Sequence, residues 1–409
     1  MPLFLQGHAG HPDWRTALVF AGAQIDAAQN DAAQAAAADA SEPTLGFVYF
    51  SHHYSPHADA LLAALRERWP GVAWAGSVGI GVLASGVEYF DEPALSLLLT
   101  SLPRSSFKVF SGAQPLGRFG SDTALVHADP STPELAELVA EMSERTASHY
   151  VFGGLASSVG DAMHIADGVF RGGLSGVAFA RDVGLVSRVT QGCQPIGPVR
   201  RITGAERNII HTLDGEPALD ALFADLRADV DDPRAAIPKL RATLVGISDA
   251  RDARAATLAR PRQFGEETRV RHLVGIDPGA QSIAVAEVVE PGMQLAFCQR
   301  DMQAARRDLV RICSEIRDEV AEGAASTTLH PAAMEDTTLE HPPARRIVGA
   351  LYFSCTGRGG PHFGGPSAEA QIVQRALGDV PLTGFFAGGE IGHRHLYGYT
   401  GVLTVFTAG

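Results

Sequence analysis

The chain has 409 residues, 45% of them hydrophobic and 19% charged, with a formal net charge of −13 at pH 7, so two or three domains are expected. The negative charge argues against nucleic acid or an anionic membrane as the main partner, and no apolar run approaches the roughly 18 residues of a membrane span. The absence of a secretory signal in residues 1–13 and of any Cys-x-x-Cys pair predicts a cytoplasmic protein with free thiols.

In the first part of the chain, residues 1–42 are expected to form an N-terminal extension with a surface helix over 32–40. A strand is predicted over 45–50. A helix opens at Pro56, and its apolar residues recur with the 3.6-residue period of a buried helix face. Further strands are predicted at 72–75, 94–100 and 107–111.

Thr132 and Pro133 then predict a helix start, with Thr as the cap and Pro in the first turn. A buried strand is expected over 150–154. Residues 173–180 and 183–190 predict an antiparallel hairpin.

The second half begins with a turn-rich boundary segment, 192–198, and the amphipathic residues 301–322 predict a long helix later on. We interpret 324–345, which lacks any periodicity, as a mobile loop. A shorter helix is expected to begin at Pro217. Strands are predicted at 199–203, 208–213, 273–276 and 282–288.

One strand–helix–strand pattern occurs twice, starting at Leu45-Gly-Phe-Val-Tyr-Phe-Ser51 and at Val348-Gly-Ala-Leu-Tyr-Phe-Ser354. Each copy ends in a glycine-rich run, 76–81 in the first and 384–392 in the second, which we interpret as turns. The repeat predicts an α/β fold of two related lobes, whose mixed, largely antiparallel sheets are flanked by helices. It is not the alternating pattern of a doubly wound chain.

Three motifs of the second half resemble the C-terminal FIST domain: Gly192-Cys-Gln-Pro-Ile-Gly-Pro198, Phe353-Ser-Cys-Thr-Gly-Arg-Gly359 and Gly384-Phe-Phe-Ala-Gly-Gly-Glu-Ile-Gly392. Gly153-Gly-Leu-Ala-Ser157 is similar to part of the N-terminal FIST domain. The resemblance implies a FIST N-terminal domain over 43–191 and a FIST C-terminal domain over 192–407. The first glycine-rich run departs from the family pattern, because no carboxylate follows it until Glu88.

The resemblance implies a sensory protein of intracellular signal transduction that binds a small ligand, such as an amino acid, and signals to a separate partner, such as a histidine kinase. A bacterial subset of the family resembles haem-binding nitric-oxide sensors that act on a histidine kinase. A haem-based gas sensor is therefore the alternative, and a ligand-free adaptor is the third interpretation. We expect no resident cofactor in the first case and haem in the second.

Glu390 and Arg358 are the central candidates for ligand binding, since a carboxylate and a guanidinium could hold the two ends of an amino acid. The alternative for Glu390 is a turn cap or an arginine partner. The alternative for Arg358 is pairing with Glu390 or Asp301, and Asp301 is expected to cap the helix that follows it. The other predicted ligand-binding residues are Cys355, Gly388, Gly389, Gly359 and Arg300.

Three smaller features bear on chemistry. Cys355 could be a reactive thiol near Arg358 or simply a small buried residue. The clusters His52-His53-x-x-x-His57 and His393-Arg-His395 could bind a metal or haem, as could Cys193 for haem, or they could be surface histidines without a ligand. No Gly-x-Ser-x-Gly elbow, phosphate-binding loop or His-Glu-x-x-His motif is present, so we expect no enzyme.

Overall fold

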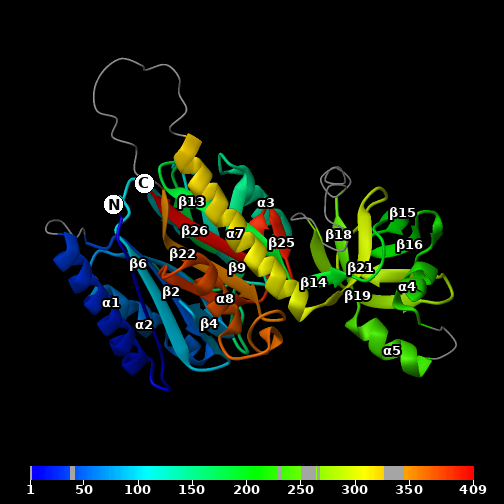
Figure 1. Ribbon diagram of the computed structural model, residues 1–409, viewed down its shortest axis with the longest axis horizontal. Helices are drawn as coiled ribbons and strands as arrows, with labels where there is room; N and C mark the ends of the chain where they lie inside the picture. Colours follow the sequence, from blue (N-terminus) through cyan, green and yellow to red (C-terminus); the bar gives the residue numbers. More distant parts are fainter. Residues whose placement is uncertain (1, 37–41, 229–232, 250–263, 265–267, 327–344) are drawn as a thin grey trace, which may run out of the picture. The chain divides into compact units, whose positions relative to one another are not determined.

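The computed structural model describes residues 2–36, 42–228, 233–249, 264, 268–326 and 345–409. The fold is α/β with mixed sheets, as predicted, and the chain divides into two compact units (Figure 1). Unit 1 comprises residues 1–190, 306–396 and 400–409, and unit 2 comprises 191–305 and 397–399. Among these described residues, no helix combines the length and the apolar character needed to cross a membrane.

The first sheet of unit 1 has two helices packed on one of its faces. Helices α1 (Trp14–Ala36) and α2 (Ala58–Arg68) bury Ile25, Leu61 and Leu65 against strand residues such as Val48. A short 3-10 helix, η1 (His52–His57), leads into α2. The strands, in sheet order, are β1 (Phe4–Gly10), β6 (Ala94–Thr100), β2 (Leu45–Ser51), β3 (Ala73–Gly79), β10 (His164–Ala166) and β11 (Val169–Phe170).

The second sheet is covered by helix α3 (Leu135–Glu144), whose Val139 and Met142 pack against Val126 and Val151 of the sheet. Its strands, in order, are β7 (Phe107–Phe110), β12 (Leu174–Phe179), β8 (Thr123–Ala128), β9 (Tyr150–Leu155), β24 (Glu390–His393) and β25 (His395–Tyr397).

The third sheet is associated with helices α7 (Met302–Ser326) and α8 (Ala368–Leu377) and with the 3-10 helix η2 (Gly360–Phe363). Arg188 of its edge strand pairs with Glu319 of α7. The strands, in order, are β13 (Gly184–Gln191), β26 (Thr400–Ala408), β22 (Arg346–Cys355), β23 (Leu382–Ala387), β4 (Gly81–Ala84) and β5 (Val87–Phe90).

These three sheets share one order: an outer strand, an antiparallel strand, a parallel pair joined by a helix, and a hairpin. The parallel pairs are β2–β3, β8–β9 and β22–β23. The hairpin that follows each parallel pair in the chain is added to a different sheet. Strand β4 pairs with β23, β10 pairs with β3 and β24 pairs with β9. The predicted repeat is therefore confirmed and has a third copy, and all three copies lie in unit 1.

Gly76, Gly153 and Gly384 occupy the same place in the three parallel pairs. At each of them a Cβ atom would come within 1.7–1.9 Å of a carbonyl oxygen of the neighbouring parallel strand, so no side chain fits. The prediction that 76–81 and 384–392 form turns is therefore wrong for most of their length. Strand β3 continues to Gly79 and β23 to Ala387, because Gly76 and Gly384 let the paired backbones approach closely within a sheet.

The three sheets meet at a central ring cluster, which we define as Tyr49, His127, Phe353 and Phe385. In their strands, Tyr49, His127 and Phe353 each come one residue after the residue that pairs with a close-approach glycine. The Tyr49 hydroxyl lies 3.0 Å from His127 Nε2, and the rings of Tyr49 and Phe353 lie 5.8 Å apart between centroids. All four side chains are fully buried, so this cluster is the core shared by the three sheets.

Unit 2 is built on a closed ring of antiparallel strands. The ring runs through β21 (Gln294–Arg300), β15 (Arg200–Glu206), β16 (Ile209–Leu213), β20 (Ser282–Val285), β19 (Arg269–Asp277) and β18 (Leu244–Ser248), and β18 pairs back to β21. Strand β14 (Cys193–Pro195) pairs antiparallel with β21, and β17 (Glu216–Pro217) pairs with β16. The described residues of the unit also form helices α4 (Ala218–Leu226) and α5 (Pro233–Ala242). Leu222 and Phe297 belong to its apolar core.

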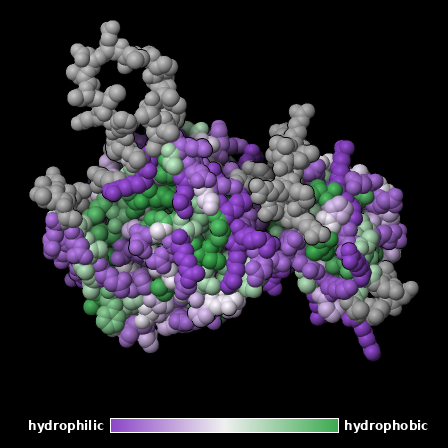
Figure 2. Space-filling view, in the orientation of Figure 1, coloured by the Kyte–Doolittle hydropathy of each residue, from purple (hydrophilic) through white to green (hydrophobic). Residues whose placement is uncertain are grey.

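The face of the molecule in Figure 2 is mostly hydrophilic, with apolar residues exposed between the polar ones on unit 1. On α1, Val19 and Phe20 are exposed although the opposite side of the helix is buried. The prediction of an N-terminal extension is wrong for residues 4–36, because β1 pairs with β6 along its whole length and α1 contributes to the core. The helix expected at 32–40 is the end of α1, which the structure describes to Ala36.

Other sequence predictions are corrected by the pairing of strands. Strands β12 and β13 exist, but they lie in different sheets and form no hairpin. Thr132 does not cap α3, which begins at Leu135, because its hydroxyl accepts a hydrogen bond from the Gly173 N–H instead. The range 192–407 is not one compact unit, since 306–396 and 400–409 fold with unit 1. Most of the loop expected at 324–345 lies outside the described residues.

We expect Gly76→Ala to lower the free energy of unfolding by about 1–3 kcal/mol, because the added methyl group would collide with the Val48 carbonyl oxygen. Urea denaturation of the purified variants measures this loss. Gly112→Ala is the matched control, since a Cβ there meets no atom within 4 Å. Equal stability of the two variants would contradict the close-approach argument.

Candidate functional site

Arg358 and Glu369 form an ion pair that is completely buried in unit 1. Arg358 Nε lies 3.2 Å from Glu369 Oε1, and neither side chain has solvent exposure. The same carboxylate accepts hydrogen bonds from the Tyr352 hydroxyl at 2.5 Å and from Ser354 at 2.9 and 3.0 Å. The partner of Arg358 is therefore Glu369 of α8, which the sequence reasoning did not identify.

The ion pair ties several elements of unit 1 together. The guanidinium donates to the backbone oxygen of Thr190 at 3.2 Å and to its hydroxyl at 3.1 Å, and that hydroxyl donates to Asp308 of α7 at 2.9 Å. The ring of Phe363 lies 5.2 Å from the guanidinium carbon. Because the network joins β13, β22, α7, η2 and α8, we interpret it as a structural clamp around the turn that follows β22.

Glu390 is also fully buried, but it belongs to a different part of the site. Its Oε2 accepts hydrogen bonds from the Thr400 hydroxyl at 2.6 Å and from the Thr400 N–H at 3.3 Å, while Oε1 is buried with no hydrogen-bond partner among the described residues. Burial raises the pKa of this carboxyl to about 8, against the smaller opposing effects of Thr400 and Arg358. Glu390 is therefore a neutral acid at pH 7 in the folded chain.

The other predicted residues are dispersed. Cys355 is a buried thiol at the end of β22 that forms no disulfide, and its carbonyl oxygen accepts hydrogen bonds from the Arg358 and Gly359 N–H groups. Arg300 belongs to unit 2, where its guanidinium lies 5.6 Å from the ring of Tyr399. Gly389 bonds to Leu155 through its carbonyl oxygen. Asp301 caps α7 as predicted, accepting a hydrogen bond from the Ala304 N–H at 2.5 Å.

An open cleft of about 780 Å³ lies in unit 1 at the ends of the parallel strands. Ile80 follows β3, Asp129 follows β8, Ala156 follows β9, Thr356 follows β22 and Gly388 follows β23. Ligands of α/β proteins commonly bind beyond the carboxyl ends of strands, and cavities of this volume hold small molecules. The cleft therefore has the position and the size of a ligand site, and Gly388 is the predicted site residue that lines it.

Hydrogen bonds between the sheets fix the floor of this cleft. The Ser157 hydroxyl accepts from the Ile80 N–H at 2.9 Å and donates to the Phe386 carbonyl oxygen. The Gly388 N–H donates to the Leu155 carbonyl oxygen at 3.0 Å. One serine thus joins strand ends of all three sheets, which gives the cleft a rigid base.

The cleft carries charges of both signs. Burial raises the pKa of Asp129, but hydrogen bonds from Ser131 and the Gly172 N–H outweigh it and leave the pKa below its ordinary value, so Asp129 is ionised. Arg171 Nε lies 3.4 Å from Asp161, and both side chains are more than half exposed. Such a loose, exposed pair is weak and could exchange for the charged groups of a ligand. The Thr356 N–H donates to the Ala387 carbonyl oxygen at 2.9 Å, which holds this residue at the wall of the cleft.

The two histidine clusters have different surroundings. His52 and His53 lie side by side, with ring centroids 4.1 Å apart, whereas His57 lies against the ring of Trp14. His393 packs edge-on against the ring of Tyr150, with centroids 4.6 Å apart. Cys193 is buried in unit 2 beside Cys298, to which it is hydrogen-bonded.

The sequence reasoning missed the charged residues of the cleft. Asp129, Asp161 and Arg171 are spread over short loops of the second repeat copy, which was not detected as a repeat. The signal that could have found them is the segment Asp129-Pro-Ser131, which is a polar turn directly after a buried strand and therefore resembles the turns after the other two copies.

Comparison with known proteins gives a consistent result over most of the chain. A sequence model of the FIST N domain matches residues 44–216, and one of the FIST C domain matches residues 225–393. The uncharacterized protein Rv0628c of Mycobacterium tuberculosis is 32% identical over 382 residues, which are 89% of this chain and 91% of that protein. The uncharacterized protein Mb0898c of Mycobacterium bovis is 30% identical over 385 residues, which are 89% and 90% of the two chains.

We expect Glu369→Ala to lower the free energy of unfolding by about 3–5 kcal/mol, because it leaves the Arg358 guanidinium buried without its carboxylate. Thermal and urea denaturation measure the loss. Glu141→Ala is the control, since it removes an exposed pair with Arg145, and we expect a change below about 0.5 kcal/mol. Similar effects of the two variants would show that the buried network is not a clamp.

We expect the contribution of Glu390 to stability to fall as pH rises from about 4.5 to about 8. In this range the folded state keeps a proton on Glu390 that the unfolded chain releases, so each pH unit costs about 1.4 kcal/mol. Glu390→Gln, which is neutral throughout, should remove this part of the slope in denaturation midpoints measured at pH 5.5 and 8.5. Burial also raises the pKa of Glu88 to about 7, so Glu88→Gln should remove a second part of the slope, whereas the buried His127, with its pKa lowered to about 3, contributes a slope of the opposite sign below about pH 6.5. Parallel profiles for wild type and Glu390→Gln would contradict the assignment.

Proposed function

The chain belongs to the FIST family, and from this premise we propose that the cleft of unit 1 binds a small zwitterionic metabolite of the amino-acid class. FIST domains are associated with sensing in signal transduction. The observation that supports the ligand class is the presence of carboxylates and a guanidinium in one cleft, together with hydroxyl groups. An amino acid offers the complementary ammonium and carboxylate groups.

The proposed roles follow from the charges of the cleft. Arg171 would hold the ligand carboxylate, because a guanidinium pairs with a carboxylate through two parallel hydrogen bonds. Asp161, released from Arg171, and the ionised Asp129 would attract the ammonium group. The Thr356 hydroxyl would complete the contacts from the third sheet. Glu390 and Arg358 would then act on the ligand through the strands that they hold, since neither lines the cleft.

The signal would pass to a separate cytoplasmic protein such as a histidine kinase, and we propose a binding protein rather than an enzyme. Ligand binding at the cleft can affect all three sheets, because strand ends from each of them meet there. A ligand that contacts several of these ends would favour one arrangement of them over another. The haem-based alternative makes a separate demand, namely an axial ligand in an apolar pocket, whereas the lining of this cleft includes the charged residues Asp129, Asp161 and Arg171.

A thermal-shift screen with the common amino acids tests the proposal, because a ligand bound only by the folded chain raises the melting temperature. We expect one or a few amino acids to raise it, and calorimetry should then show at least about tenfold weaker binding by Arg171→Gln and Thr356→Val. Arg181→Gln, at an exposed arginine of the β12–β13 connection, is the matched control.

Two results would overturn this assignment. The first is that no amino acid raises the melting temperature. The second is that Arg171→Gln binds the amino acid as tightly as Arg181→Gln does. An absorption spectrum of protein incubated with haem, recorded after gel filtration, distinguishes the alternative, since a retained Soret band would favour a haem-based sensor.

A further inference from the structure

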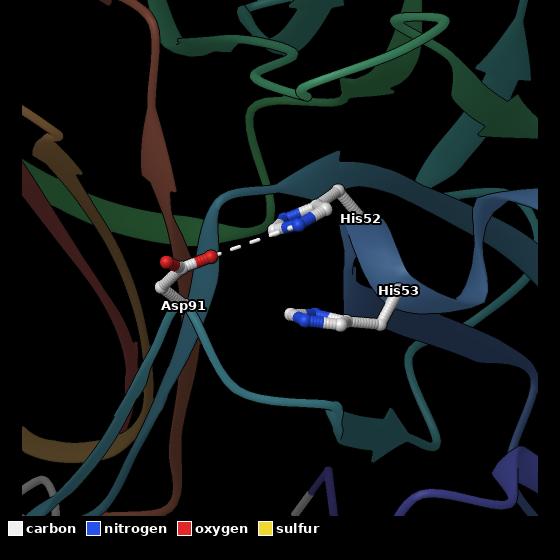
Figure 3. A group of neighbouring side chains, drawn as sticks. All are labelled: His52, His53 and Asp91. Carbon is white, nitrogen blue, oxygen red and sulfur yellow. Dashed lines mark ion pairs between the residues drawn. The ribbon is translucent and has the colours of Figure 1, made fainter.

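His52, His53 and Asp91 bring two imidazoles and a carboxylate together at the surface of unit 1. One ligand atom from each residue lies within 4.8 Å of the others. Figure 3 shows both rings projecting from η1 toward the same space, with the Asp91 carboxylate facing them. Asp91 comes from the residues directly after β5, so the group joins two segments that are distant in the sequence.

Backbone hydrogen bonds hold these two segments in place. The Ala94 N–H, close to Asp91 in the chain, donates to the Ser51 hydroxyl at 3.0 Å, directly before His52. The Asp91 N–H donates to the Ile80 carbonyl oxygen at 3.1 Å. The positions of His52 and Asp91 are therefore set by ordered secondary structure on both sides and do not depend on their own side-chain contact.

His52 and Asp91 form an ion pair that is too long for a hydrogen bond. His52 Nε2 lies 3.6 Å from Asp91 Oδ1, beyond the range of about 2.7–3.2 Å for a hydrogen bond. Two ligands of a tetrahedral zinc ion, with bonds of about 2.0–2.1 Å, lie about 3.3–3.4 Å apart. The observed separation is thus close to that of two ligands around one cation.

The protein leaves the ligand atoms of this group available. The ligand atom of His52 is Nε2, which faces Asp91, while its Nδ1 is buried with no hydrogen-bond partner; among the described residues no hydrogen bond reaches the His53 ring or the Asp91 carboxylate. His53 and Asp91 are exposed, so a cation can enter from solvent. His57, the third histidine of the sequence cluster, packs against Trp14 and is not part of the group.

We propose that His52, His53 and Asp91 bind a divalent transition-metal cation, with Zn²⁺ as the representative ion. Imidazole nitrogen and carboxylate oxygen are the donor set that suits zinc and its neighbours in the first transition row. Three protein ligands leave a coordination position for water or for a small anionic ligand, as in sites that are not purely structural. The proposal does not rest on amino-acid binding, because none of these three residues lines the cleft.

Calorimetric titration of the metal-free full-length protein with Zn²⁺ tests the site. We expect one Zn²⁺ per chain, at least about tenfold weaker binding by Asp91→Asn and His53→Gln, and no detectable binding by the double variant His52→Gln/His53→Gln. His57→Gln is the matched control, since it removes a histidine of the same 3-10 helix and should bind as wild type does. Melting temperatures without metal verify that every variant is folded.

Titration with Co²⁺ provides a second readout, because cobalt bound by nitrogen and oxygen ligands in a low-coordinate site absorbs more strongly in the visible range than hexaaqua cobalt. We expect this absorption in wild type and His57→Gln and its loss in the double variant. The proposal is wrong if wild type binds neither ion, or if the double variant binds Zn²⁺ as tightly as His57→Gln does.

Discussion

The packing of Tyr49, His127, Phe353 and Phe385 is the interaction on which unit 1 depends. Each of the three sheets places a ring at this point. Tyr49, His127 and Phe353 each come one residue after the position that faces a close-approach glycine, and Phe385 directly follows Gly384. Burial lowers the pKa of His127 to about 3, so its ring is neutral and packs as an aromatic side chain beside Tyr49. Together with the exchanged hairpins, this contact holds the three sheets, and hence their strand ends, in place.

The cleft and the histidine group are consequences of that placement. Three turns follow the first strands of the three parallel pairs, and they differ in composition: His52-His53 in the first copy, Asp129-Pro-Ser131 in the second and Thr356-Gly-Arg358 in the third. The second supplies charge to the cleft, the third combines a cleft residue with the buried clamp, and the first faces Asp91. Equivalent turns of the repeat therefore carry three different sets of functional groups.

The sequence predicted those parts of the fold that depend on local pattern. The strand that begins at Leu45, helix α2 and the Asp301 cap follow from periodicity and capping alone. Strand partners depend on distant residues, so the hairpin exchange was not predictable. The shared Tyr-Phe-Ser letters were also misleading, because Tyr49 is equivalent to Phe353 and not to Tyr352. A shift of one residue places Tyr352 on the opposite face of its sheet, where it meets Glu369.

The exchange of hairpins also has a consequence for synthesis on the ribosome. Ser96 of β6 bonds to Thr383 of β23, 287 residues later, and β4 pairs with the same late strand. At about 5–20 residues per second, β4 is made roughly 15–60 s before its partner. During that interval one side of the β4–β5 hairpin has an open edge that is prone to aggregation. The edge of β4 is therefore covered by its native partner only after the last repeat has emerged.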